Sequence, residues 1–392
     1  MKLSKYTLPD FFKSRTLSLT ESQANLPASH GGVRSLELIR VLWIISLYLA
    51  LGSFVLLMGC SDSAPNGGAD GKTQVQVLRY QGHTGAVFFP ELAEDLGYLA
   101  PIKLQYVGNV LGGPPDIQTV VTHDVDFGTA FTGAIIKLRA AGLAIKSVIT
   151  SYGTDNATFF GHFVTEDSPI KTARDLIGKK IAVNTLGAHS DFIIREYLAR
   201  NGLTPQEIEK VELVVIPPVN AEQALRNHQV DAVALNGVLK DLALQRGGLR
   251  LLFTDLELFG PFNAGSYVFT EDFIAQNPDT VAKFVEATAK AIEWARNTPK
   301  EDVIARYKKI IASRGRNEND QAINFWKSPG IATKGGLILP SDFQVWLDWL
   351  VKNGQLKPGQ LALTDLYDNR FNPYTKDATL ADTQTLTEQK PL

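Results

Sequence analysis

The chain has 392 residues, of which 44% are hydrophobic and 20% charged, and its formal net charge is −2. At roughly 100–200 residues per domain this length predicts two domains. The near balance of 39 basic and 41 acidic residues excludes the basic face that nucleic-acid binding requires. A single cysteine excludes a disulfide framework and a cysteine-based zinc cluster, and the six histidines include no i, i+4 pair. We therefore expect no metal and no other cofactor.

An apolar run of 19 residues without a charge, 41–59, follows Arg34 and Arg40. It is long enough to cross a bilayer as a helix. It ends in Leu57-Met58-Gly59-Cys60, which resembles the processing site of bacterial lipoproteins, where the cysteine thiol carries the lipid. We predict that residues 1–59 are a lipoprotein signal segment and that Cys60 is lipidated. A plain transmembrane anchor is the alternative, and with either anchor the rest of the chain is exported and tethered to a membrane.

The residues on either side of this run are polar. Residues 1–32 form a longer polar prefix than signal peptides carry, so we expect translation to begin near Val33. Residues 60–72 are small and polar and predict a flexible tether. The tether ends in Gly71-Lys72, but no strand and no second glycine at the required spacing precede it, which excludes a phosphate-binding loop. Residues 1–59 hold six basic and three acidic residues, so the mature chain carries a formal charge of −5.

From Thr73 onward, β-rich runs alternate with helical stretches, a pattern that predicts parallel sheets covered by helices on both faces. In such sheets ligands bind beyond the carboxyl ends of the strands, at helix N-termini. The strands are expected at 74–80, 102–107, 145–152, 159–164, 180–184, 211–216 and 231–235. The helices are expected at 86–96, 116–122, 134–141, 191–200, 221–228, 238–245, 278–296, 300–312 and 341–351.

Turn residues predict where some of these elements begin and end. Thr172 is placed to cap a short helix that Gly178 follows as a left-handed stop. Thr204-Pro205 has the N-cap and first-turn proline of another helix.

Loops rich in glycine, threonine and serine are the candidate ligand-binding segments, because small residues let backbone N–H groups approach a ligand and hydroxyls add donors. His189, Ser190 and Asp191 include the residue types of a hydrolytic triad, but adjacent residues on a helix do not face one another, so we expect no catalysis there. The loops lie at 81–85, 112–115, 128–133, 186–190 and 236–237.

Five segments together resemble the solute-binding proteins of ABC importers, specifically the nitrate/sulfonate/taurine-type family. They are 88–98 (FFPELAEDLGY), 113–128 with its Val-Asp-Phe-Gly end, 170–183 (IKTARDLIGKKIAV), 187–203 and 224–233 with its Val-Asp-Ala-Val end. The resemblance extends from about residue 75 to about residue 297 and rests on the order and spacing of these segments.

This resemblance implies an α/β, two-lobed periplasmic-binding-protein fold (type II), with two mixed sheets flanked by helices and joined by two crossover strands. Lobe one would be 73–160 plus 260–392 and lobe two 161–259, with crossovers near 160–164 and 262–268. The family implies a monomeric extracytoplasmic receptor, facing the periplasm or cell exterior, that catalyses no reaction. It would deliver a small anion to an ABC permease and ATPase complex.

The family's binding positions fall on loops of both lobes. Hydroxyls and backbone N–H groups would hold the polar head of the solute, three side chains would orient it, and one ring would pack its apolar part. In that order these groups are Thr84, Gly85, Thr129, Thr132 and Ser190; then His83, His189 and Asn236; then Phe131.

Two departures bear on the ligand. Many sulfonate binders have an aromatic residue after the Val-Asp-Ala strand, where this chain reads Ala234-Leu235-Asn236, and a proline in the loop that matches 131–133. Phe131 and His83 favour a larger, aromatic or pyrimidine-type solute as the alternative ligand. A ligand-sensing receptor with the same trap is the alternative role. The pyrimidine-synthesis enzymes of this superfold depend on a cysteine-rich segment that this chain lacks.

Overall fold

The structure, a computed structural model, describes residues 74–110 and 112–376. The predicted signal segment, the tether and Cys60 lie outside these described residues, as does the region around Val33. Within the described part, no helix combines the length and the apolar character needed to cross a bilayer.

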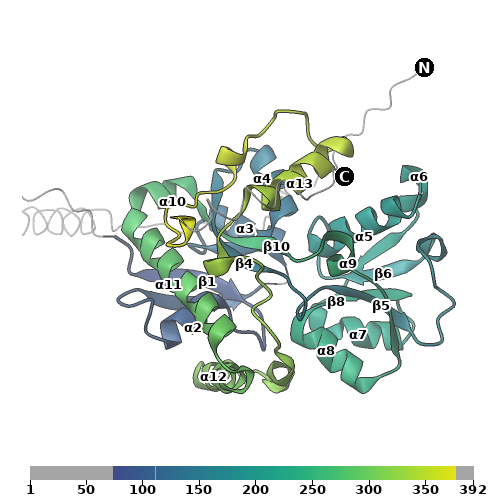
Figure 1. Ribbon diagram of the computed structural model, residues 1–392, viewed down its shortest axis with the longest axis horizontal. Coiled ribbons are helices and arrows are strands. Elements are labelled where there is room, and N and C mark those ends of the chain that lie inside the picture. Colours follow the sequence, from purple (N-terminus) through teal and green to yellow (C-terminus); the bar gives the residue numbers. More distant parts are fainter. Residues whose placement is uncertain (1–73, 111, 377–392) are drawn as a thin grey trace, which may run out of the picture. The chain divides into compact units, whose positions relative to one another are not determined.

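The first lobe is built on two groups of hydrogen-bonded strands (Figure 1). Strands β1 (Val77–Gly82) and β2 (Lys103–Asn109) pair in parallel. Strand β10 (Phe262–Thr270) lies between β3 (Gly128–Phe131) and β4 (Ile145–Thr154) and is antiparallel to both. The helices of this lobe are α2 (Phe89–Asp95), α3 (Gly113–Val121), α4 (Thr132–Ala140), α10 (Glu271–Gln276), α11 (Pro278–Asn297), α12 (Lys300–Ser313) and α13 (Pro340–Lys352).

The second lobe contains one five-stranded mixed sheet in the order β7-β6-β8-β5-β9. Strand β6 (Lys180–Val183) is parallel to β7 (Glu212–Val215) and β8 (Ala232–Leu235), whereas β5 (Gly161–Thr165) is antiparallel to β8 and to β9 (Leu249–Thr254). The helices of the second lobe are α5 (His189–Arg200), α6 (Pro205–Ile208), α7 (Pro218–Arg226), α8 (Gly237–Arg246) and α9 (Asp255–Phe259), with the short 3-10 helix η1 (Ala173–Leu176). Figure 1 shows α7 and α8 on one side of this sheet and α5 and α6 on the other.

The chain passes between the lobes through 155–160, from β4 to β5, and through 255–261, from β9 to β10. We call these segments the first and second crossover. A further segment, 314–333, begins after α12 in the first lobe and contains the 3-10 helix η2 (Gln321–Phe325), which packs against α8 of the second lobe. We call this segment the strap. The lobe boundaries at 160 and 260 stay a prediction.

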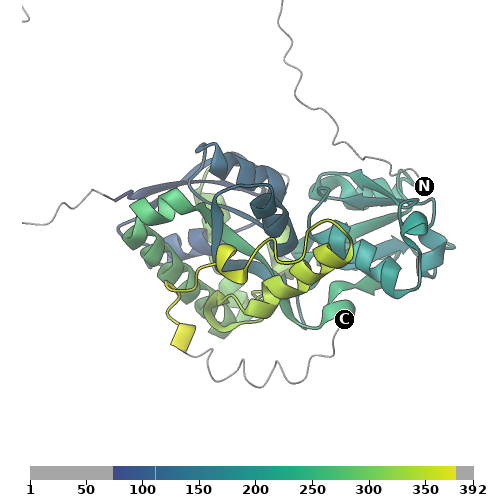
Figure 2. The same ribbon diagram turned by 90° about the horizontal axis from the view of Figure 1, so that it is seen from above.

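A buried apolar cluster extends from one lobe into the other. It includes Phe131, Phe192 and Trp346, whose rings pack edge-on with centroids 4.9–5.7 Å apart. In Figure 2 the yellow-green helix α13 reaches toward the second lobe, where Trp349 Nε1 donates to Glu196 Oε2 at 2.9 Å. The two lobes are therefore in direct contact beside the crossovers. Short 3-10 helices, η3 (Lys334–Gly336) and η4 (Leu363–Asp365), flank α13.

The predicted capping residues are confirmed. Thr204 caps α6, with its Oγ1 accepting from Glu207 N at 3.3 Å, and Thr172 begins η1 in a reciprocal capping box. Gly178 follows with φ +75°. The expectation that 128–133 is a loop is wrong, because residues 128–131 pair with β10 as strand β3 and Thr132 and Gly133 begin helix α4.

Candidate ligand-binding site

In each lobe, both crossovers connect to the sheet at the same end of its strands. In the first lobe, Phe131 at the end of β3 pairs with Gly265, and Thr154 at the end of β4 pairs with Phe262. Both partners lie at the beginning of β10, so the carboxyl ends of β3 and β4 lie together at this edge. We call it the first-lobe edge.

The second lobe repeats this arrangement. Leu235 at the end of β8 and Thr254 at the end of β9 both pair with Gly161, the first residue of β5. Because β6 and β7 are parallel to β8, their carboxyl ends lie at the same edge. We call it the second-lobe edge, and the two crossovers join it to the first-lobe edge.

Helices begin at both edges, and the edges touch. Helix α4 follows β3 directly, α8 follows β8 after Asn236, and α5 follows the loop after β6. A Cβ added to Gly112, at the start of α3, would lie 2.7 Å from Thr185 Cγ2 on the opposite lobe, so the absence of a side chain at Gly112 allows this close approach. Unpaired N–H groups of the first helical turns favour anions. The arrangement places such termini from both lobes around one junction.

The loop 83–86 after β1 is held by residues of its own lobe. The His83 ring lies edge-on to Phe88 with centroids 5.4 Å apart, and burial lowers its pKa. The exposed Thr84 accepts a hydrogen bond from Asn109 Nδ2 at 2.9 Å. Gly85 N donates to Glu318 Oε2 at 2.7 Å, and its φ of +72° and the Asn319 carbonyl, 2.9 Å from a Cβ position, require glycine. The loop therefore has a fixed shape.

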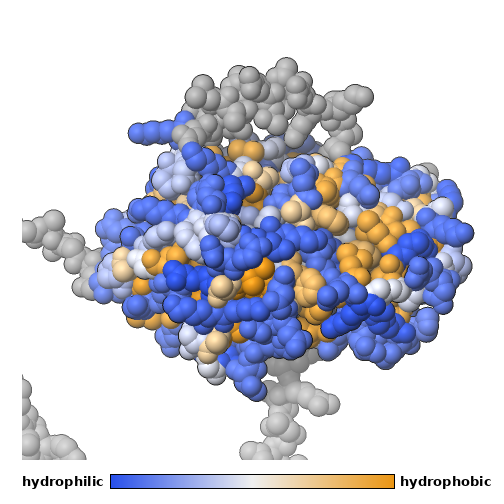
Figure 3. Space-filling model, turned by 60° about the horizontal axis from the view of Figure 1, so that its bottom comes forward, coloured by the Kyte–Doolittle hydropathy of each residue, from blue (hydrophilic) through white to orange (hydrophobic). Residues whose placement is uncertain are grey.

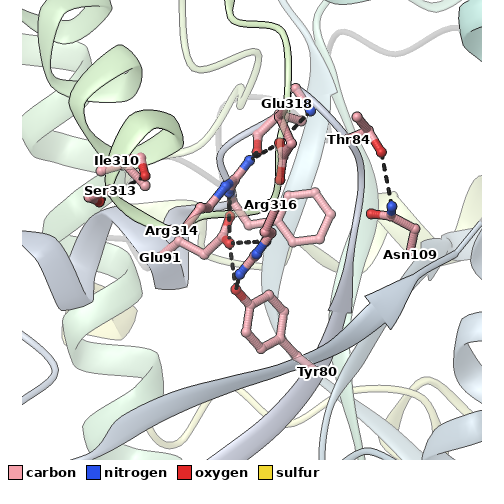
Figure 4. Close-up of polar contacts among 12 residues, drawn as sticks. Tyr80, Thr84, Glu91, Asn109, Ile310, Ser313, Arg314, Arg316 and Glu318 are labelled. Atoms are coloured by element: carbon pink, nitrogen blue, oxygen red, sulfur yellow. Dashed lines mark hydrogen bonds and ion pairs between the residues drawn. The ribbon is translucent and has the colours of Figure 1, made fainter.

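An ionic network that sequence reasoning missed fixes this loop (Figure 4). Glu91 Oε1 accepts from Tyr80 Oη at 2.5 Å, from Arg314 Nη1 at 2.9 Å and from Arg316 Nη1 at 3.2 Å. Arg314 Nη2 reaches the loop carbonyl of Ala86 at 2.7 Å, and the Arg316 guanidinium lies 3.5 Å from the Tyr106 ring centroid. Burial is the main cause that raises the pKa of Tyr80, so its hydroxyl stays a donor.

Both arginines come from the strap, and the Arg-Gly-Arg sequence after α12 is the signal that could have marked them. With Glu318, which accepts from Arg314 Nη2 at 2.5 Å, the network contains two cations and two carboxylates and is neutral. The network holds the 83–86 loop and adds no net positive charge there.

Thr129 has partners within the first lobe. Its backbone N–H donates to Asp116 Oδ2 at 2.7 Å, and its Oγ1 lies 2.5 Å from Ser151 Oγ. Asp116 is 1% exposed, and among the described residues its Oδ1 has no hydrogen-bond partner. Burial raises the pKa of Asp116 to about 7. A ligand at Thr129 would have to share or displace these bonds.

Phe131 and His189 are the predicted site residues that the structure brings into direct contact. Their rings stack with centroids 5.0 Å apart and 7° between planes, and both residues are almost fully buried. Thr132, also buried, donates its Oγ1 to the Ala264 carbonyl at 2.9 Å. These three side chains therefore pack the junction between the lobes.

His189 also meets both crossovers. Its ring centroid lies 4.0 Å from that of Phe160, and its Nε2 is 3.2 Å from Asp255 Oδ2. Asp255 is 0% exposed and accepts from Thr154 Oγ1 at 2.6 Å and from Phe160 N at 3.0 Å. One carboxylate thus ties the first crossover to the second.

The remaining predicted residues lie on the second-lobe edge. Ser190 is in the first turn of α5 and 3% exposed. Asn236 is exposed at the N-cap of α8, and its side chain makes no capping bond. Asp191 Oδ2 accepts from Gly187 N at 2.8 Å, which shapes the loop before α5. The binding roles of all nine predicted residues stay predictions.

A separate cavity of about 130 Å³ lies where α4, α5 and α13 meet. Within the predicted loop 186–190 it is lined by Gly187, and the other lining residues are Lys137, Asp191, Phe192, Arg195, Trp349 and Gln355. None of the nine predicted site residues lines it.

Two buried groups give the stability opposite dependences on pH. His162 is 1% exposed and stacked on Phe253, and burial lowers its pKa to about 3 from an ordinary 6.5. Between these values the unfolded chain binds the extra proton, so the free energy of unfolding falls as the pH falls. For Asp116 the folded chain holds the extra proton between its ordinary 3.8 and about 7, so the free energy of unfolding falls as the pH rises.

Each effect is about 1.4 kcal/mol per pH unit, and in the wild type they largely cancel. We expect His162→Phe to gain stability relative to the wild type as the pH is lowered from 6.5 to 4. Asp116→Asn should gain stability relative to the wild type as the pH is raised from 4 to 7. Urea unfolding at a series of pH values measures both, and variant curves parallel to the wild type would contradict the two assignments.

Comparison with solved structures defines the class as a two-lobed periplasmic-binding-protein fold. The alkanesulfonate-binding protein SsuA of Xanthomonas axonopodis pv. citri, bound to MOPS, aligns with TM-score 0.59 and 18% identity over 76% of this chain and 100% of that chain. The nitrate-binding protein NrtA of Synechocystis aligns with TM-score 0.59 and 15% identity over 81% of this chain and 91% of that chain. The desulfurization enzyme DSZB aligns with TM-score 0.53 and 19% identity over 79% of this chain and 100% of that chain. At these identities the likeness concerns the fold alone.

The sequence comparisons identify the family. The model of the NMT1/THI5 like family matches residues 92–302, more than half of the chain, and the chain belongs to this family. A Bacillus subtilis protein named for aliphatic sulfonate binding is 25% identical over 64% of this chain and 74% of its own length. An Escherichia coli protein that is also named for aliphatic sulfonate binding is 30% identical over 45% of this chain and 54% of its own length. The nitrate import ATP-binding protein NrtC of Synechococcus elongatus is 30% identical over 29% of this chain and 17% of its own length.

Proposed function

We propose that this chain is an extracytoplasmic receptor that binds a small anion of the sulfonate, taurine or nitrate class and delivers it to an ABC importer. The observation that carries the proposal is the convergence of helix N-termini from both lobes at the joined edges. A ligand that contacts both lobes favours the closed arrangement by its differential affinity for it. The names of the curated relatives, which refer to sulfonate binding, support the anion class.

The second-lobe edge adds an apolar component to this site. Three exposed apolar side chains lie there: Leu186 after the end of β6, Val215 as the last residue of β7 and Val219 in the first turn of α7, at 52%, 49% and 62% exposure. In Figure 3 apolar surface gathers on the right, over the second lobe, among hydrophilic surroundings. A polar head at the helix N-termini with an aliphatic portion on these side chains fits an organic anion better than nitrate.

The partners and location follow from the same proposal. A permease and an ATPase would receive the solute, and the similarity to part of an import ATP-binding protein supports such a system. We propose that the receptor is a monomer held to the membrane, facing the periplasm or cell exterior, by a lipid on Cys60, which lies outside the described residues.

We propose that the chain is not an enzyme, although DSZB shares its fold. Ser190 and His189 are neighbours in the first turn of one helix, and the His189 ring is stacked between Phe131 and Phe160 at 3% exposure. This ring has no path to a substrate proton in the described arrangement, which favours binding without chemistry.

The proposal is tested by thermal unfolding of the mature chain against a panel of alkanesulfonates, taurine, nitrate, aromatic acids and pyrimidines. A ligand at 100 times its Kd should add about 2.7 kcal/mol to the free energy of unfolding. We expect Ser190→Ala to lower the affinity for the anion about tenfold, because it removes a hydrogen-bond donor to a charged group. Stabilisation by neutral solutes alone would contradict the anion class, and unchanged affinity would remove Ser190 from the site.

A further inference from the structure

Lys240 is a buried lysine with few partners. It lies in the first turns of α8 and its side chain is 1% exposed. Its Nζ donates to the Phe159 carbonyl at 3.3 Å and lies 3.3 Å from the centroid of the Phe159 ring. An ammonium group has three N–H donors, and this one hydrogen bond is long.

The carboxylate beside Lys240 is engaged elsewhere. Asp241 Oδ1 is 3.9 Å from Lys240 Nζ but accepts from Lys327 Nζ, on the strap, at 2.8 Å. Asp155 and Asp255 attract the ammonium from further away, and Lys327 repels it. Three carboxylates thus attract the ammonium, but among the described residues no carboxylate oxygen lies closer to Lys240 Nζ than 3.9 Å.

The position of Lys240 is unfavourable for folding. A cation near a helix N-terminus opposes the helix dipole, and burial lowers the pKa of this lysine. Folding would be favoured by an apolar residue of the same length, since a buried charge with poor hydrogen bonding costs more than it returns. Residues that destabilise a fold in this way are concentrated at functional sites.

Lys240 also lies at the junction where the proposed ligand would bind. Helix α8 begins at the second-lobe edge, directly after β8, and Asn236 at its N-cap makes no capping bond. Phe159, which covers the ammonium, belongs to the first crossover. The buried charge and the N–H groups of the first turn of α8 thus lie at the same edge, beside a segment that connects the lobes.

We propose that Lys240 and the first turn of α8 form the subsite for the anionic head of the ligand, an oxyanion such as a sulfonate. The inference rests on the proposed function. Lys240 would supply the positive charge for the ligand, because the Arg314–Arg316 network is neutral. On binding, the Phe159 ring leaves the ammonium, and charge-assisted hydrogen bonds to the oxyanion replace the cation–π contact.

The experiment compares the wild type with Lys240→Met and with Lys179→Met as the matched control. Lys179 belongs to the same lobe but precedes the amino end of β6, and its side chain is 40% exposed and pairs with Asp231 at 3.5 Å. The probes are inorganic sulfate and methanesulfonate at constant ionic strength, followed by calorimetric titration and by the Tm. We expect Lys240→Met to raise the Tm of the ligand-free protein and to weaken both probes about tenfold or more, from the loss of charge-assisted bonds.

Lys179→Met should bind both probes within about threefold of the wild type, as for a partly exposed ion pair. Lys240→Arg, which keeps the charge, should retain part of the affinity. Equal affinity of Lys240→Met and wild type for methanesulfonate would overturn the inference and leave the proposed function intact. If sulfate binding depends on Lys240 but methanesulfonate does not bind the wild type, the inference stands and a sulfonate ligand is excluded. If neither probe binds the wild type, the inference fails, and the wider ligand panel described above decides the proposed function separately.

Discussion

We expect the replacement of Phe131 by alanine to lower the free energy of unfolding of the ligand-free protein by about 3–5 kcal/mol. The ring is 1% exposed, stacks on His189 and meets Phe192 and Trp346 edge-on at 5.2 and 4.9 Å. Its removal leaves a cavity at the place where the two lobes meet, lined by the rings of His189, Phe192 and Trp346. Urea unfolding followed by tryptophan fluorescence measures the loss.

Phe131→Leu is the control, because it keeps most of the apolar volume and should cost less than half as much as the alanine variant. The comparison separates two roles for this side chain. The sequence resemblance assigns Phe131 to the ligand, whereas the structure gives it partners inside the protein. An alanine variant that keeps its stability but loses affinity would show that the packing role is wrong.

The second large effect is expected at Asp255. Its replacement by alanine should cost about 3–5 kcal/mol, as for the loss of one member of a buried charged network. The change removes the acceptor of Thr154 Oγ1 and of Phe160 N and the neighbour of His189 Nε2. Since the carboxylate joins both crossovers, we also expect faster amide hydrogen exchange at Phe160 in the variant.

Asp255→Asn keeps the shape and one acceptor oxygen and should lose less stability. Thr154→Val in each background completes a double-mutant cycle, which we expect to give a coupling of about 1–2 kcal/mol for this hydrogen bond. If Asp255→Ala lowered the free energy of unfolding by less than about 1 kcal/mol, the carboxylate would contribute no more than a surface ion pair. That result would contradict its role as a buried link between the two crossovers.

Much of the fold could be predicted from local patterns. The capping residues Thr172 and Thr204 act within four residues of the chain, so their signals are complete in the sequence. Strand β3 was predicted as a loop because it is only four residues long and begins with Gly128, which has low strand preference. Only pairing with β10, more than 130 residues later, makes this segment a strand. Strand β9 was missed for a similar reason, since its strand character depends on pairing with β5.

The candidate site divides in the same way. The loops 81–85 and 186–190 were located from their small residues, and both lie where the strands lead into helices. Their partners could not be predicted, because Glu318 reaches Gly85 across 233 residues and no local pattern encodes that distance. Lys240 was also missed, since a lysine in a helix ordinarily lies on a solvated face, and only the tertiary structure shows that this one is buried.

The strap gives the lobes a third attachment within the described part of the chain. Its first residues hold the 83–86 loop through Glu318 and Arg314, and its last residues bind the second lobe and the first crossover through Lys327 and Ser328. Relative motion of the lobes therefore has to accommodate the strap as well as the two crossovers. A displacement of the second lobe that strains the Lys327–Asp241 pair is therefore transmitted along the backbone as tension on the loop that carries Thr84. The receptor thus has a mechanical link from the position of one lobe to the shape of the other lobe's binding surface.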